Sequence, residues 1–87
     1  MGQLLVKKKA AACVNLIPGI TSWYWWKGKP EEGKEYLLLI KTHRKKLSKL
    51  YELLRVHHSY KLPEFIAVGI LWGERDYLNW LRSSLKV

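Results

Sequence analysis

The chain has 87 residues, 48% of them hydrophobic, which is too apolar for a disordered segment and predicts one small domain over residues 1–87. Five Trp and five Tyr are more than a protomer of this size buries easily, so we expect some of them at an interface with other subunits. The formal charge of +9 raises the question of an anionic partner.

The first predicted element is the end of an amphipathic helix over Leu4 to Lys9. It has no N-cap signal and no room for a full helix, so we expect the chain to begin in the middle of an element. A strand follows from Cys13 to Ile17, bends at Pro18-Gly19 and continues from Thr21 to Trp26.

A second strand, centred on Glu35 to Lys41, completes a hairpin whose connection is predicted to be long, because Gly and Pro punctuate the polar stretch Lys27 to Lys34. Tyr36, Leu38 and Ile40 alternate with Leu37 and Leu39, so both faces of this strand are apolar. We expect helices to cover one face and another structure to cover the other face.

After the hairpin, Thr42 or His43 is expected to cap a helix over residues 44–57, with an apolar stripe that includes Leu50 and Tyr51. A third strand is predicted over residues 64–71. A last helix over residues 74–85 has acidic residues in its first turn, and its predicted buried face holds the following residues: Tyr77, Leu78, Trp80, Leu81 and Leu85.

The basic residues are spread over several segments: Lys7 to Lys9, Lys27 to Lys34, Lys41 to Lys49 and the last helix. This spread favours a solvated surface over a nucleic-acid footprint. One cysteine excludes a disulfide framework, and the apolar runs are far shorter than the roughly 20 residues that span a bilayer. We therefore predict a soluble, intracellular and most plausibly cytoplasmic protein; a targeting signal encoded ahead of Met1 would fall outside this sequence.

The predicted order of elements is that of a ferredoxin-like fold, a split βαβ with an antiparallel sheet and helices on one face, in the α+β class. Its first strand is missing, and a further helix follows at the C-terminus. Because that first strand is central in the fold, its absence is expected to leave the strand at 64–71 detached.

Four segments also resemble the CutA family of divalent-cation-tolerance proteins, animal members included, and they occur in the family's order. They are AACVNLIPGITSWYWWKGK, EYLLLIKT, HSYKLPEFIAV and YLNWL. Relative to the family, this chain is similar to a form that lacks the N-terminal strand and most of the first helix.

The resemblance implies a tight homotrimer in which the hairpin forms contacts between subunits. It also implies an intersubunit cleft, whose residues in this chain are Cys13, Tyr24, Trp26, Gly28, Lys41, His58, Tyr60 and Glu64. The chain departs from the family at His58-Ser59-Tyr60-Lys61, where a proline is lost and a base replaces an acid. If that acid attracts a metal ion, the site is weakened here.

Cys13, His58 and Glu64 are the candidate ligands for copper or another divalent cation, since copper binds thiolate and imidazole donors. Each also has a simpler interpretation. Cys13 would be a small buried hydrophobe, His58 a solvated or capping residue, and Glu64 an ion-pair partner of Lys41. Trp23, Trp25 and Trp26 could stack on nucleotide bases, but a core or interface role is favoured.

No hydrolase, zincin or nucleotide-binding motif is present, and a Cys13–His58 dyad has no third group to orient it, so the chain is predicted not to be an enzyme. The predicted function is a homotrimeric, copper-binding protein of metal tolerance. Two alternatives stay open: a trimeric scaffold associated with the anchoring of acetylcholinesterase, and a signalling trimer like the PII proteins, which bind small effectors between subunits.

Overall fold

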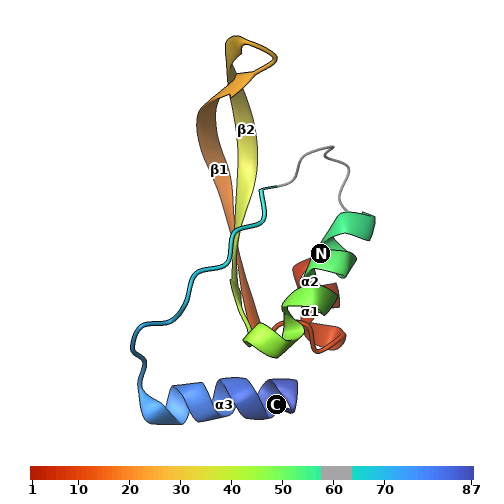
Figure 1. Ribbon diagram of the computed structural model, residues 1–87, viewed down its shortest axis with the longest axis vertical. Coiled ribbons are helices and arrows are strands. Elements are labelled where there is room, and N and C mark those ends of the chain that lie inside the picture. Colours follow the sequence, from red (N-terminus) through yellow and green to blue (C-terminus); the bar gives the residue numbers. More distant parts are fainter. Residues whose placement is uncertain (58–63) are drawn as a thin grey trace.

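The computed structural model describes residues 1–57 and 64–87 (Figure 1). Its elements in chain order are α1 (Gly2–Lys7), β1 (Cys13–Trp26), β2 (Lys29–Lys41), the 3-10 turn η1 (Arg44–Lys46), α2 (Leu47–His57) and α3 (Arg75–Leu85). The described residues therefore combine a long antiparallel hairpin with helices, which confirms the predicted α+β class.

The bend predicted at Pro18-Gly19 is present as a β-bulge. Ile17 pairs with Leu37 and Ile20 pairs with Glu35, so two residues of β1 stand opposite one residue of β2. Gly19 has a φ of 74°, which a residue with a side chain rarely adopts. The extra residue shifts the alternation of β1, so that Cys13 and Ile17 before the bulge share a face with Ile20 after it.

The long connection predicted for residues 27–34 is wrong. The strands extend until Trp26 pairs with Lys29, leaving Lys27 and Gly28 as a tight turn. Both turn residues have positive φ, 51° and 78°, as in the type I′ turns whose twist matches that of a hairpin. Turn geometry at two residues thus overrides the poor strand propensity of the Pro, Glu and Gly residues that follow.

Helices α1 and α2 pack on one face of the base of the hairpin. The core there is formed by Leu5, Ala10, Ala11 and Leu50, and Val14 and Ile40 pack against it from the two strands. On the opposite face, Leu37 and Leu39 are 43% and 46% exposed. Helices therefore cover one face of the hairpin, as predicted, and the other is open in the protomer.

The connection into α2 follows the predicted capping. His43 has an extended backbone, and its Nδ1 accepts a hydrogen bond from the backbone N–H of Lys45, 3.1 Å away. One residue earlier, the Thr42 hydroxyl donates to the carbonyl oxygen of Ala10 at 2.7 Å. This second bond joins the end of β2 to the turn that follows α1.

The strand predicted over residues 64–71 is wrong. Within the described residues, the segment 64–74 pairs with no strand and runs as irregular coil from beside the hairpin to α3 (Figure 1). Its start is packed, where the ring of Phe65 meets that of Tyr51 edge-on at 5.2 Å. A strand needs a neighbouring strand to satisfy its backbone and cover its side chains. The segment 64–74 has none among the described residues, and the Val68 side chain is 86% exposed.

Helix α3 is capped by Glu74, whose carboxylate accepts the backbone N–H of Tyr77 at 3.0 Å. Leu81 and Leu85 are buried, as predicted. Tyr77 and Trp80 are 43% and 47% exposed, so their assignment to the buried face is wrong for the protomer. Their rings lie 5.5 Å apart, against each other and not in the core.

Candidate functional site

The base of the open face brings two of the predicted cleft residues together. Cys13 and Lys41 are directly opposite each other in the ladder, and both are half-buried. The Lys41 ammonium donates a hydrogen bond to the Oδ1 of Asn15, which lies two residues along the same face. Sequence reasoning missed Asn15, although its alternation with Cys13 places it on this face.

Two more predicted residues, Tyr24 and Trp26, lie on the same face near the tip of the hairpin. The register and the bulge give them the same facing as Cys13. Tyr24 lies across Gly33, where an added Cβ would come within 3.1 Å of the Tyr24 hydroxyl. Glycine at position 33 therefore allows the Tyr24 ring to lie flat on the opposite strand, while Gly28 forms the turn beyond it.

The base and the tip are far apart in one protomer. Eleven residues of β1 separate Cys13 from Tyr24, which at about 3.3 Å per residue is a distance of roughly 36 Å. The whole chain is 45 Å along its longest axis. One protomer therefore does not bring the predicted cleft residues into a single site.

Of the three candidate metal ligands, Cys13 and Glu64 lie within the described residues. Cys13 is a free thiol, and Glu64 is an exposed residue at the start of the segment 64–74. His58, like the cleft residue Tyr60, lies outside the described residues. In residues 1–57 and 64–87 there is no group of three or more His, Cys, Asp or Glu side chains that could hold a metal ion.

The hairpin carries a second aromatic pair on its other face. Trp23 and Trp25 are 72% and 75% exposed, and the Trp23 indole N–H donates to a Glu32 carboxylate oxygen at 2.8 Å. Trp23 and Trp25 are therefore not core residues of the protomer, and an interface role stays the prediction for them. Strand alternation could have separated them from Tyr24 and Trp26 in the sequence.

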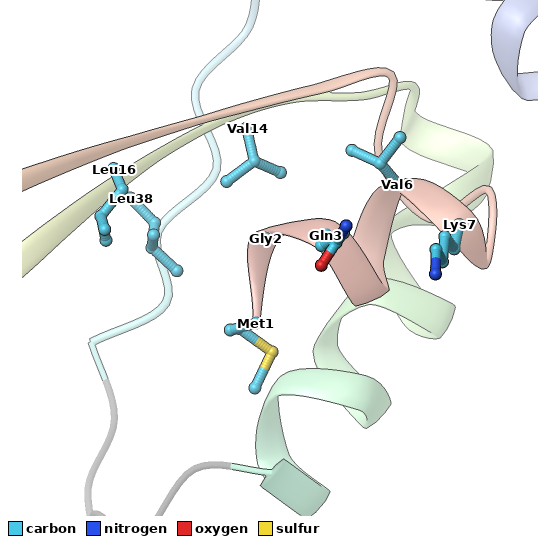
Figure 2. Close-up of a pocket in the computed structure, with 8 residues that line it drawn as sticks. All are labelled: Met1, Gly2, Gln3, Val6, Lys7, Val14, Leu16 and Leu38. Carbon is cyan, nitrogen blue, oxygen red and sulfur yellow. The ribbon is translucent and has the colours of Figure 1, made fainter.

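An open hollow of about 530 Å³ lies between the start of α1 and the helix-facing side of the hairpin (Figure 2). It is lined by Met1, Gly2, Gln3, Val6, Lys7, Val14, Leu16 and Leu38. The lining is mostly apolar and includes none of the predicted cleft residues. The hollow is therefore distinct from the open face.

Comparison with known proteins identifies the family. The family model described as CutA1 divalent ion tolerance protein matches residues 1–84. The chain belongs to the CutA1 family. It is 44% identical over 84 residues to the divalent-cation tolerance protein CutA of Thermus thermophilus, covering 97% of this chain and 82% of the relative.

Solved CutA structures have the same fold. The Thermus thermophilus CutA1 structure superimposes with a TM-score of 0.93 at 44% identity, over 95% of this chain and 81% of that chain. A structure described as the PII-like protein CutA from Nostoc gives 0.88 at 30% identity, over 97% and 82%. These matches confirm the ferredoxin-like class, and the CutA1 family is non-enzymatic, as predicted.

The CutA relatives differ in length and compartment. The chloroplastic CutA 1 of rice is 45% identical over 82 residues, which are 94% of this chain but 46% of that protein, so this chain spans about half the length of that relative. The structure from Archaeoglobus fulgidus is described as that of a periplasmic divalent cation tolerance protein. None of the helices in the described ranges is long and apolar enough to cross a membrane.

Proposed function

We propose that this chain is a divalent-cation tolerance protein that binds copper, or a related divalent cation, in a cleft between the subunits of a homotrimer. The observation that carries the proposal is the spacing along the open face. Cys13 and Lys41 lie at its base and Tyr24 and Trp26 near its tip, roughly 36 Å away. These residues can share one site only if the tip of one subunit meets the base of another.

The open face also has the chemistry of a subunit contact. It presents Ile17, Leu37 and Leu39 beside the pair of Cys13 and Lys41. Aliphatic side chains that are close to half exposed lose their contact with water when a second copy covers them. An interface at this face therefore supplies the second cover that the two apolar faces of β2 require.

The proposed donor set is Cys13, His58 and Glu64. A thiolate and an imidazole suit copper, and a carboxylate is a common third donor for a divalent cation. Lys41 would hold Asn15 beside Cys13 and add no donor of its own, because an ammonium carries no lone pair.

Copper titration tests the donor set. Wild-type protein and the Cys13→Ser and Glu64→Gln variants are titrated in competition with a chromophoric copper chelator. Loss of a ligand should weaken binding by roughly tenfold or more, as losses at metal sites commonly do. The matched control is Glu35→Gln, because Glu35 lies on the same face but accepts a hydrogen bond from Ser22.

The control variant should bind copper like the wild type. If Cys13→Ser also binds copper unchanged, the thiol is not a ligand. If neither variant differs from the wild type while trimers persist, the proposed cleft does not hold the metal.

The description of the Nostoc relative as PII-like supports a second candidate, a trimer that binds a small anionic effector between its subunits. Selective thermal stabilisation by one nucleotide among a panel would support this role. The association with acetylcholinesterase and the cytoplasmic location stay predictions, and relatives described as chloroplastic and periplasmic show that the compartment varies within the family.

A further inference from the structure

Two basic runs that are far apart in the sequence converge at the base of the molecule. Lys7, Lys8 and Lys9 end α1 and its turn, and Arg44, Lys45 and Lys46 form η1. The Thr42 hydroxyl bonds the Ala10 carbonyl at 2.7 Å, and the Ala12 N–H bonds the Lys41 carbonyl at 2.9 Å. Lys9 directly precedes Ala10, and Arg44 follows Thr42 by two residues, so both runs lie next to these bonds.

Packing fixes the two runs against each other. Leu5 of α1 and Leu50 of α2 belong to the same buried cluster as Ala10 and Ala11. Figure 1 shows α1 and α2 beside the base of the hairpin. The two runs and Lys49 form what we call the basic patch: Lys7, Lys8, Lys9, Arg44, Lys45, Lys46 and Lys49.

The basic patch contains no acid. The seven acidic residues of the chain are Glu31, Glu32, Glu35, Glu52, Glu64, Glu74 and Asp76, and none interrupts either run. Glu52, three residues after Lys49 in α2, pairs with Arg55. In the ranges 1–57 and 64–87, the ion pairs are Arg55 with Glu52 and Arg75 with Asp76, and neither involves the patch. All its members are exposed except Lys46, which is half-exposed.

We propose that the basic patch binds the phosphate backbone of nucleic acid without reading its sequence. Seven cations from two segments suit an extended polyanion, and lysine ammonium groups neutralise backbone phosphates as point charges. The spread of basic residues along the chain favoured a solvated surface, but the fold gathers two of the basic segments on one surface. The open face, where the trimer is proposed, is on the opposite side of the hairpin from α1 and α2.

A lipid surface is the less suitable anion. Surfaces that bind membranes combine cations with aromatic or aliphatic side chains that enter the bilayer. Neither basic run contains an aromatic or aliphatic residue. Of the large aliphatic residues that adjoin the runs in the sequence, Leu47 packs against the core and Val6 is 41% exposed, so one partly exposed side chain is all that they offer to a bilayer. The strongly exposed Trp23 and Trp25 lie near the tip of the hairpin, at the far end of the molecule.

The test is fluorescence anisotropy of a labelled DNA duplex of about 20 base pairs, titrated with the full chain at several salt concentrations. If three to four phosphates are neutralised, the logarithm of the binding constant should fall against the logarithm of salt concentration with a slope of about −3. The triple variant Lys7→Glu, Lys9→Glu and Lys45→Glu should lose at least about tenfold in affinity at low salt.

The matched control makes the same change of charge on exposed lysines outside the patch, in the triple variant Lys27→Glu, Lys29→Glu and Lys34→Glu. Circular dichroism verifies that both variants fold like the wild type. An equal loss in both variants would show that only net charge matters and would overturn the proposal. Binding to phosphatidylserine vesicles through the patch, with none to the duplex, would overturn the assignment to nucleic acid.

Discussion

His43 and Glu74 each begin a helix by accepting a backbone N–H that the helix itself leaves unsatisfied. His43 accepts from Lys45 and Glu74 from Tyr77. Both residues are recognisable in the sequence, His43 as one of two possible caps and Glu74 as an acid at the start of a helix. The cap at Glu74 also makes the stability of α3 depend on pH.

Hydrogen bonds from the backbone N–H groups of Asp76 and Tyr77 hold the pKa of Glu74 below its usual value. A carboxyl whose pKa is lower in the folded state than in the unfolded state stabilises the folded state. This contribution is complete at pH values above the unfolded pKa, near 4.5, and is lost as the pH falls through the folded pKa. We expect α3 to become less stable below pH of about 4.5 in the wild type. Thermal unfolding followed by circular dichroism between neutral and acidic pH should show a smaller acid-induced change in Glu74→Gln.

Gly28 is the residue whose replacement should most directly damage the hairpin. Its φ of 78° is strained for any residue with a Cβ. The variant Gly28→Val should lose about 1–2 kcal/mol of stability. The control is Gly69→Val, since Gly69 has open space around it and no positive φ, and urea unfolding should leave it close to the wild type. Equal losses in both variants would contradict the role of the turn.

At the scale of elements, periodicity in the sequence was sufficient for the hairpin, the bulge and two of the helices. It made the hairpin connection too long, because Glu31, Glu32 and Gly33 have low strand propensity and Pro30 usually marks a loop or an edge. In the structure these residues pair with the aromatic end of β1. Their strand is stabilised by the cross-strand partner, which local propensity does not register.

The segment 64–74 shows a different limit. Its β-branched pattern predicts a strand, but a strand exists only with a partner, and within the described residues none is paired with it. The expectation that this segment would be detached followed from the order of strands in the ferredoxin-like fold. Topology was therefore a better guide here than the residues of the segment itself.

The contact between α1 and α2 depends on Leu50, which is 2% exposed in the buried cluster. Truncation in Leu50→Ala should cost about 2–5 kcal/mol, because it removes buried methyl groups and leaves a cavity. Val56 on the same helix is 70% exposed, so Val56→Ala should change stability by less than about 0.5 kcal/mol. Urea unfolding of the two variants would contradict this packing if they were equally stable.

For the whole molecule, the proposed trimer gives the sharpest test. Lysine in place of both Leu37 and Leu39 would put charges in the centre of the open face, and native mass spectrometry should then detect monomers in place of trimers. The control is Tyr36→Lys on the other face of β2, since Tyr36 is 71% exposed there, and it should remain trimeric. A monomeric wild-type protein would refute the trimer.

Sequence alone proposes residues for the candidate site but does not give their arrangement. Alternation alone would put Cys13 and Tyr24 on opposite faces of β1, and the bulge at Pro18-Gly19 brings them to the same face. Alternation also does not show how far the base lies from the tip, since that distance depends on where the hairpin turns. The convergence of the two basic runs was also hidden, because it results from packing between α1 and α2.

The two-residue turn at Lys27 and Gly28 has a consequence for the order of folding. The pair next to the turn closes a loop of only two residues, and each later pair of the β1–β2 ladder forms beside a pair that already exists. The hairpin can therefore form from its turn outwards with little loss of chain entropy at each step. Such hairpins form within about 1–10 μs, well before most domains complete their packing. The open face would then form early. It would be available for contact with other copies before α3 has packed.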